Sequence, residues 1–401
     1  MAEQLAAPHR RHLRQIIQAV VCAVWIGLNF GASACAEIKS VSGRAFGTSY
    51  TLKLNHVGKL NHDGSHLSVD SVASMVADEL ERIESIFSLY RTDSELSRLN
   101  QCDAGLWVPV SQDLFSVLQF AVQLADQTAG ALDPTVRPLM EAWDMHRASI
   151  DWSPPSSEAI REAQNFVGIG YIELQDETRS LRKNLDSVRL DLNALVEGWA
   201  IDQVLKLLRQ AGAHNALFEI GGEFGGVGES SNGQAWTIGI EDPRDVRRLF
   251  AKVALDNSSL CTSGTYRQAR MHDGKSYSHI IDPRTGHPLD HELTAVSVVH
   301  ASAMVADGWA TALMVLGPEQ GPSIANKNQL AASFVKRDPA AHIKLTARAG
   351  GIFDLQLVQR VSTPHDRPSP MFRPLWIVPV AMAILFVFAV TKKWASATRQ
   401  P

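Results

Sequence analysis

An uncharged apolar run near the C-terminal end limits how the chain can fold. Pro374–Val390 ("PLWIVPVAMAILFVFAV") has no charged residue over 17 positions, about enough for an α-helix to cross a hydrocarbon layer of roughly 30 Å. Lys392 and Lys393 follow, so the positive-inside rule places 392–401 in the cytoplasm. A buried core helix is the alternative, but the proline-rich linker 360–373 precedes the run. This favours a transmembrane helix over 374–391.

The N-terminal residues 1–36 have the pattern of an export signal. Three arginines precede an apolar stretch from Ile16 to about Phe30, which ends at the small residues of Ala32–Ala34. This order is typical of a secretory signal peptide or an uncleaved anchor. Cys35 leaves lipidation open as an alternative. Both ends of the chain therefore predict a body on the periplasmic side of the cytoplasmic membrane, tethered to it.

The region between the two ends, 38–359, is predicted to be the globular domain. The chain has 45% hydrophobic residues and a net charge of −4, with no basic stripe, which argues against nucleic acid as a partner. Cys102 and Cys261 are the cysteines of this region. We expect two buried thiols rather than a disulfide.

Hydrophobic periodicity predicts an α+β body. Apolar residues at helical spacing predict four helices, and alternating or short apolar runs predict four strands. The helices are expected over 72–90, 113–130, 196–213 and 302–317, and the strands over 49–55, 215–223, 236–243 and 293–300. Because strands and helices do not alternate regularly, we expect mixed or antiparallel sheets with packed helices rather than a doubly wound sheet.

Polar residues gather at the junctions of these elements. Asp133 follows a glycine that ends a helix, and Asp191 precedes the start of another helix, where free N–H groups favour phosphate oxygens. Gly221–Gly222 let the backbone approach a ligand closely, and "CTSGTYR" (261–267) offers hydroxyl groups and an arginine. A turn residue at Asp133 and a helix cap at Asp191 are the alternatives.

A carboxylate and a hydroxyl suggest a cation site. Asp307 and Thr311 lie four residues apart in "MVADGWATALMVLG", so both side chains fall on one face of a helix. Such oxygen ligands suit Mg²⁺, although a surface pair would have the same spacing. The segment 277–286 ("YSHIIDPRTG") ends on a turn, and its two isoleucines are expected to form a strand that carries His279 and Asp282.

Eight segments together resemble the ApbE family, the FAD:protein FMN transferases. They occur in the family's order from about Gly47 to Gly317: "GTSYTL", "FSLYRTDSELSRLN", "GALDPTVRPLMEAW", "LDLNALVEGWAID", "IGGE", "CTSGTYR", "YSHIIDPRTGHPL" and "ADGWATALMVLG". The resemblance implies an ApbE-like α+β body that binds FAD as its substrate, together with Mg²⁺.

The resemblance also implies roles for single residues. Those expected to bind FAD are Phe46, Tyr90, Ala131, Leu132, Asp133, Asp191, Glu197 and Ile281. Mg²⁺ would be held by Asp307, Thr311 and a backbone carbonyl near Ala194. His279 is our candidate general base, with a structural hydrogen bond near the flavin as the alternative, and Asp307 is the second candidate. Glu197 departs from many relatives, which have a lysine at this position.

The implied reaction transfers FMN to a threonine or serine hydroxyl of an acceptor protein and releases AMP. The expected acceptor is a membrane redox subunit of the Rnf, Nqr or NosR type, and a NosX-like role in nitrous-oxide respiration is one possibility. Two alternatives remain open: a Mg²⁺-dependent FAD pyrophosphatase, and a membrane-tethered protein that binds FAD without turning it over.

Overall fold

A computed structural model of the chain describes residues 38–55, 67–145, 151–243, 245–266, 269–337, 343–349 and 355–357, all within one compact unit that ends at Leu357. The predicted leader 1–36 and the predicted linker, membrane helix and tail over 360–401 lie outside these residues. In the part of the chain that is described, no helix combines the length and apolar character needed to cross a membrane.

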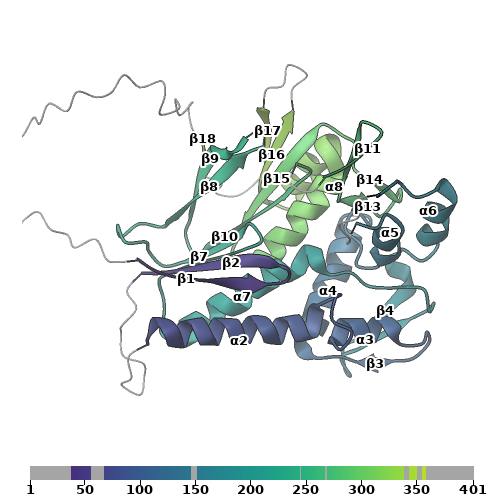
Figure 1. The fold of residues 1–401 in the computed structure, drawn as a ribbon, viewed down its shortest axis with the longest axis horizontal. Helices are drawn as coiled ribbons and strands as arrows, with labels where there is room; N and C mark the ends of the chain where they lie inside the picture. The colour runs from purple at the N-terminus through teal and green to yellow at the C-terminus, as the bar shows by residue number, and fades with distance from the viewer. Residues whose placement is uncertain are drawn as a thin grey trace, which may run out of the picture. The chain divides into compact units, whose positions relative to one another are not determined.

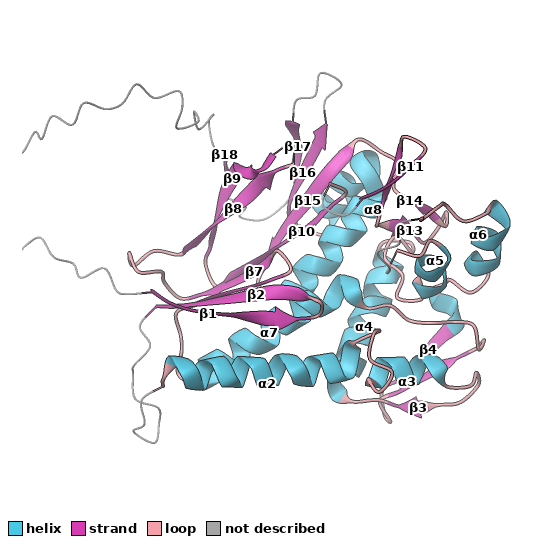
Figure 2. Cartoon of the chain, viewed as in Figure 1, coloured by secondary structure: helices cyan, strands magenta, loops and turns pink. Residues whose placement is uncertain are grey.

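An eight-stranded sheet forms the centre of the body (Figures 1 and 2). Its strand order is β1-β2-β6-β7-β10-β15-β16-β17, and every neighbouring pair is antiparallel. The strands are β1 (Ile38–Ala45), β2 (Thr48–Asn55), β6 (Ala216–Ile220), β7 (Glu223–Val227), β10 (Ser258–Gly264), β15 (Leu293–His300), β16 (Ala331–Arg337) and β17 (Ile343–Ala349). The α+β prediction with antiparallel pairing is therefore confirmed for the described body.

Two neighbouring glycines on β7 show that the sheet is covered on both faces. A Cβ on Gly225 would lie 2.4 Å from Ile201 Cγ2 on helix α7 (Asn193–Gln210). A Cβ on Gly226 would instead lie 3.2 Å from Leu255 Cβ on strand β9 (Asp245–Leu255). Since successive residues of a strand face opposite sides, helices cover one face and a second sheet covers the other.

The second sheet is small and has the order β18-β9-β8, with β8 at Trp236–Asp242 and β18 at Leu355–Leu357. Trp236, Ile238 and Ile240 alternate toward the central sheet and pack with Leu217 and Leu260 in a separate buried cluster. The strand predicted over 236–243 is thus confirmed, and its period of two places its apolar side chains in this second core.

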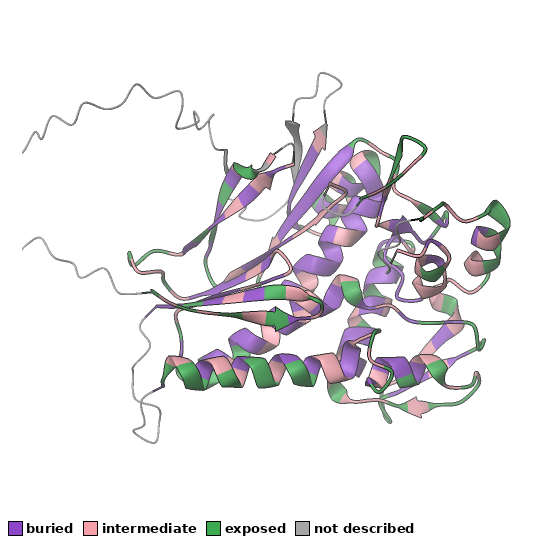
Figure 3. Cartoon of the chain, in the orientation of Figure 1, coloured by how far each residue is buried: buried purple, intermediate pink, exposed green. Residues whose placement is uncertain are grey.

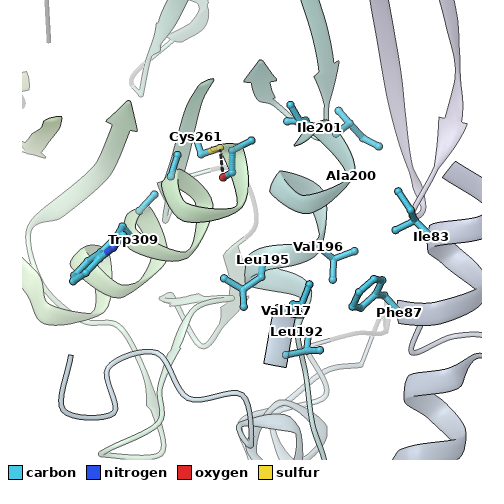
Figure 4. Packing of buried hydrophobic residues seen from close by; sticks show 14 of the residues in the cluster. Ile83, Phe87, Val117, Leu192, Leu195, Val196, Ala200, Ile201, Cys261 and Trp309 are labelled. Carbon is cyan, nitrogen blue, oxygen red and sulfur yellow. Dashed lines mark hydrogen bonds between the residues drawn. The ribbon is translucent and has the colours of Figure 1, made fainter. Parts of the chain in front are cut away.

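Helices α7 and α8 (Ala303–Lys327) pack against each other and against the central sheet. Figure 4 shows Leu195, Val196 and Ile201 of α7 between Trp309 of α8 and Phe87 of α2 (Val69–Phe87). Along α2 and α4 (Gln112–Gln127) the buried residues recur every three or four positions, and Figure 3 shows the resulting stripes on α2. This is the spacing that predicted both helices.

Gly317 ends the predicted helix 302–317 as expected. Its φ of 76° and ψ of −174° are not helical, so α8 consists of two helical segments on either side of it. Pro318 follows, and a proline at the first turn of the second segment is tolerated there. The prediction missed that this second segment continues to Lys327.

Short elements complete the body. The remaining helices are α3 (Glu95–Gln101), α5 (Arg137–Ala142), α6 (Ser157–Gln164) and the 3₁₀ turn η1 (Ile169–Tyr171). A three-stranded sheet has the order β3-β5-β4, and two hairpins pair β11 with β12 and β13 with β14. Their bounds are β3 (Val108–Pro109), β4 (Ile172–Gln175), β5 (Ser180–Lys183), β11 (Ala269–His272), β12 (Lys275–Ser278), β13 (Ile281–Asp282) and β14 (His287–Pro288).

Both cysteines of the body are free thiols. Cys261 is fully buried and donates to the Ala303 carbonyl at 3.4 Å, and burial raises the pKa of its thiol. Cys102 is only half-buried. The prediction of two buried thiols is therefore correct for Cys261 and wrong for Cys102, which follows the last residue of the surface helix α3.

Candidate functional site

A cavity of about 660 Å³ opens where the turns and strand ends of the central sheet meet the start of α7 and the middle of α8. Its volume lies in the range of small-molecule and cofactor sites. The twelve residues to which the family resemblance assigned roles all line it: Phe46, Tyr90, Ala131, Leu132, Asp133, Asp191, Ala194, Glu197, His279, Ile281, Asp307 and Thr311. The fold thus brings together residues from six segments of the sequence.

The turn between β1 and β2 places an aromatic side chain at the cavity. Phe46 and Gly47 form a two-residue hairpin connection with φ values of 52° and 74°, as in a type I′ turn. A left-handed backbone is uncommon for phenylalanine. The Phe46 N–H donates to the Glu84 carboxylate of α2, which holds the turn against the helix. Tyr90, also on the lining, is 70% exposed.

Asp133 combines a turn with a place in the cavity wall. Its Oδ1 accepts from the Thr135 N–H at 2.8 Å and from the Thr135 hydroxyl at 2.5 Å, the pattern of an Asx turn. The side chain is 6% exposed, and burial raises the pKa of its carboxyl. The two alternatives left open by the sequence, a turn residue and a cavity residue, therefore both describe Asp133.

Asp191 is held beside Asp133 by the backbone. Its N–H donates to the Pro134 carbonyl at 2.8 Å, and its Oδ1 accepts from the N–H of Asn193, the first residue of α7, at 3.0 Å. The Arg137 guanidinium lies 3.6 Å from Oδ2. Asp191 therefore satisfies a free N–H group at the start of α7 while lining the cavity.

Glu197 lies over the glycine turn that connects β6 to β7. A Cβ on Gly221 would lie 2.3 Å from Glu197 Oε2, so a larger residue would displace this carboxylate, and the φ of 65° at Gly221 favours glycine as well. Burial and then the nearby charge of Glu219 raise the pKa of Glu197 to about 7. Glu197 therefore gives the cavity a carboxyl group that is partly protonated near neutral pH.

Asp307 and Thr311 face the cavity from α8. Asp307 is 7% exposed, and its Oδ2 accepts from the Gly198 N–H of α7 at 3.2 Å. Burial, followed by the charges of Glu223 and Glu197, raises the pKa of Asp307 well above its ordinary range. A buried carboxylate among other carboxylates is unfavourable unless a cation compensates it.

The oxygen ligands around Asp307 fit a divalent cation. Thr311 is one helical turn away, its hydroxyl lies 2.8 Å from the Ser263 hydroxyl, and Ala194 lines the same cavity. One carboxylate, one hydroxyl and one carbonyl leave positions for water and phosphate, as Mg²⁺ requires. No group of three or more His, Cys, Asp or Glu side chains forms a metal cluster among the described residues. The proposed Mg²⁺ ligands include only one such side chain, Asp307, so they would not form a cluster of this kind.

The structure corrects the prediction that one strand carries both His279 and Asp282. Strand β12 ends at Ser278 and β13 begins at Ile281, so His279 lies in the break between two strands, where it lines the cavity. Asp282 does not line it. Its carboxylate accepts from Arg284 at 2.9 and 2.8 Å, and its carbonyl accepts from Gly286 at 2.9 Å. Asp282 therefore stabilises the β13–β14 turn.

The sequence did not single out Glu223. Its Oε2 accepts from the Thr262 N–H at 2.8 Å, it lines the cavity, and its charge contributes to the raised pKa of Asp307. The residue belongs to the "IGGE" segment that matched the family, so the signal was present. Its relation to Asp307 depends on the pairing of β7 with β10, which the sequence alone does not reveal.

Comparisons with known proteins agree with this geometry. Residues 46–334 match the model of the ApbE family. A FAD:protein FMN transferase of Haemophilus influenzae is 32% identical over 352 residues, which cover 83% of this chain and 99% of the relative. One of Vibrio cholerae is 34% identical over 302 residues, which cover 75% of this chain and 88% of the relative.

Solved structures give the same result. The flavin transferase ApbE from Vibrio cholerae superposes with a TM-score of 0.70 at 32% identity, covering 78% of this chain and 97% of that one. The apo form of the flavinyl transferase ApbE from Pseudomonas stutzeri superposes with a TM-score of 0.69 at 31% identity, covering 79% and 98%.

Proposed function

This chain belongs to the ApbE family and is a FAD:protein FMN transferase, and we propose that its cavity carries out a Mg²⁺-dependent transfer of FMN from FAD to a serine or threonine hydroxyl of an acceptor protein, with release of AMP. The observation that carries this proposal is the convergence, on one cavity of about 660 Å³, of the twelve residues to which the family resemblance assigned roles.

The reaction replaces one phosphorus–oxygen bond with another. The acceptor hydroxyl oxygen forms a bond to the phosphorus on the FMN side of the pyrophosphate, and the bond from that phosphorus to the bridging oxygen breaks. AMP leaves with the bridging oxygen, and the hydroxyl proton is released. A positioned base that takes this proton typically contributes about 10²–10⁴-fold in rate.

Different residues of this chain would bind the metal, accept the proton and hold FAD. Asp307, Thr311 and the Ala194 carbonyl would hold Mg²⁺, which when bound neutralises charge on the phosphate oxygens. His279, in the break between β12 and β13, would take the proton of the acceptor hydroxyl. Asp133 and Asp191 would hold FAD, and Phe46 at the β1–β2 turn would pack on its ring system.

Incubation with FAD, Mg²⁺ and a candidate acceptor tests the transfer. Covalent flavin on the acceptor, detected by in-gel fluorescence and a mass increase equal to FMN, together with AMP in solution, is the expected result. FMN and AMP without covalent flavin would instead identify a FAD pyrophosphatase. FAD that binds without being turned over would identify a binding protein.

The location and the acceptor are part of the same proposal. The sequences of 1–36 and 374–391 support an exported body tethered to the cytoplasmic membrane, where a tether would raise the effective concentration of enzyme near a membrane-bound acceptor. An acceptor of the Rnf, Nqr or NosR type fits this location. Membrane fractionation and protease accessibility in intact spheroplasts test it: a body that is protected from added protease would contradict a periplasmic location.

A further inference from the structure

Asn100 lies outside the cavity but is bonded to the segment that forms one of its walls. It belongs to α3 and lines a second cavity of about 380 Å³ rather than the first. Its Nδ2 donates to the Leu190 carbonyl at 2.9 Å, and its Oδ1 accepts from the Leu190 N–H at 2.7 Å. The side-chain amide therefore satisfies both backbone groups of a residue 90 positions away in the sequence, as a neighbouring strand would.

The clamped residue directly precedes a cavity carboxylate. Leu190 is fully buried, and the next peptide N–H, that of Asp191, donates to Pro134 at 2.8 Å. Three consecutive backbone groups are thus fixed by partners from two distant segments. Since only two soft dihedral angles separate neighbouring peptide groups, these bonds set the direction in which the Asp191 side chain leaves the backbone.

A buried lysine holds Asn100 in turn. Lys183 of β5 is 2% exposed, and its Nζ donates to the Asn100 carbonyl at 2.9 Å. Burial lowers the pKa of Lys183, because the charged form loses its hydration. An ammonium group is rarely buried without such a bond, so Lys183 supports the end of α3 from which Asn100 reaches Leu190.

We infer that Asn100 is a positioning residue for flavin transfer: it holds Leu190 so that the Asp191 carboxylate points at FAD. This inference rests on the proposed function, in which Asp191 contacts FAD. A role limited to attaching α3 to the body would also use these hydrogen bonds. The two roles differ in whether the effect of Asn100 on FAD binding passes through Asp191.

The test measures FAD affinity in purified full-length protein at fixed Mg²⁺, by the change in flavin fluorescence. Asn100→Ala is expected to raise the dissociation constant about tenfold, which corresponds to about 1.4 kcal/mol. Asn184→Ala is the matched control. The Asn184 side chain is exposed, and its hydrogen bond from Nδ2 to the Gly170 carbonyl is long and weak at 3.5 Å. This variant should therefore bind FAD like the wild type.

A double-mutant cycle with Asp191→Asn separates the two roles. If Asn100 acts through Asp191, the tenfold effect of Asn100→Ala should fall below threefold in the Asp191→Asn background. An equal factor in both backgrounds, or a dissociation constant for Asn100→Ala within twofold of wild type, would overturn the inference. If Asn100→Ala is too unstable to measure, Asn100→Asp replaces it, because this variant keeps the Oδ1 acceptor and loses the Nδ2 donor.

The premise that Asp191 contacts FAD is tested by a different result. If Asp191→Asn alone leaves FAD affinity unchanged, Asp191 does not contact FAD, and the inference is overturned with that premise. The transfer reaction is judged separately, by covalent flavin on the acceptor. A wild-type protein that flavinylates its acceptor and shows additive effects in the cycle would retain the proposed function and lose only the role of Asn100.

Discussion

The backbone N–H of Gly198 on α7 donates to Oδ2 of Asp307 on α8 at 3.2 Å. This contact requires the two helices to lie very close together. A Cβ on Gly198 would lie 2.5 Å from the Ala303 carbonyl oxygen, which is shorter than any normal contact. The glycine in "VEGWA" therefore determines where the proposed metal ligand lies relative to the start of α7.

Gly198→Ala should separate the helices and weaken both the fold and the site. Inserting a methyl group at a close backbone contact typically costs about 1–3 kcal/mol, which urea unfolding measures as a lower free energy of unfolding. Gly170→Ala is the control, since a Cβ there meets nothing within 4 Å. Equal unfolding free energies for the two variants would contradict the role of this contact.

Asp307→Asn should abolish the response of the protein to Mg²⁺. In the wild type, Mg²⁺ is expected to raise the melting temperature because it binds the folded state and compensates the buried carboxylate. The neutral amide binds Mg²⁺ poorly, and we expect flavin transfer to fall at least about 10²-fold. The measurements are melting curves with and without Mg²⁺ and the rate of transfer. A variant that Mg²⁺ stabilises as much as the wild type would show that Asp307 is not a ligand.

The same substitution should stabilise the metal-free protein near neutral pH. The pKa of Asp307 is raised in the folded state, so the folded protein favours the protonated form, and stability is lost as the pH rises through the folded-state value. Asparagine imitates the protonated form at every pH. The free energy of unfolding without metal at pH 7 should therefore be higher for Asp307→Asn than for the wild type.

Much of this site could be predicted because its residues lie in local patterns. Asp307 and Thr311 follow helical spacing, and Gly317 ended the helix at the predicted position. The turn at Asp133 is also a local property, since its partner Thr135 is two residues away. Where a structure depends on neighbours within about four residues, the sequence contains the information.

The features that were missed depend on pairings that hydrophobic periodicity does not encode. The break at His279 exists because β12 pairs with β11 while β13 pairs with β14, so two hairpins replace one predicted strand. Asp282 binds Arg284, only two residues away, rather than lining the cavity, so a local partner was missed as well. The bond from Asn100 to Leu190 spans 90 residues. No periodicity within a segment reveals such pairings.

Glu197 should make stability depend on pH between its unfolded and folded pKa values. Its pKa rises from 4.5 to about 7 on folding, so its stabilising effect is complete below pH 4.5 and is lost as the pH rises to 7. After allowance for its partial exposure, we expect a loss of about 2 kcal/mol. Glu197→Gln should remove this part of the pH dependence, as urea unfolding of the metal-free protein at pH 5 and pH 8 would measure. An unchanged difference between the two pH values would contradict the raised pKa.

His279→Gln separates the two roles left open for His279. Glutamine keeps a hydrogen-bonding side chain but cannot accept a proton near neutral pH. If His279 takes the proton of the acceptor hydroxyl, kcat should fall about 10²–10⁴-fold while KM for FAD stays within about threefold. Added imidazole should then restore part of the rate, since a small base can occupy the space of the missing ring. A variant with near wild-type kcat and a raised KM for FAD would instead show that His279 only holds the cofactor. The base would then have to be sought among the cavity carboxylates, beginning with Asp307, the second candidate.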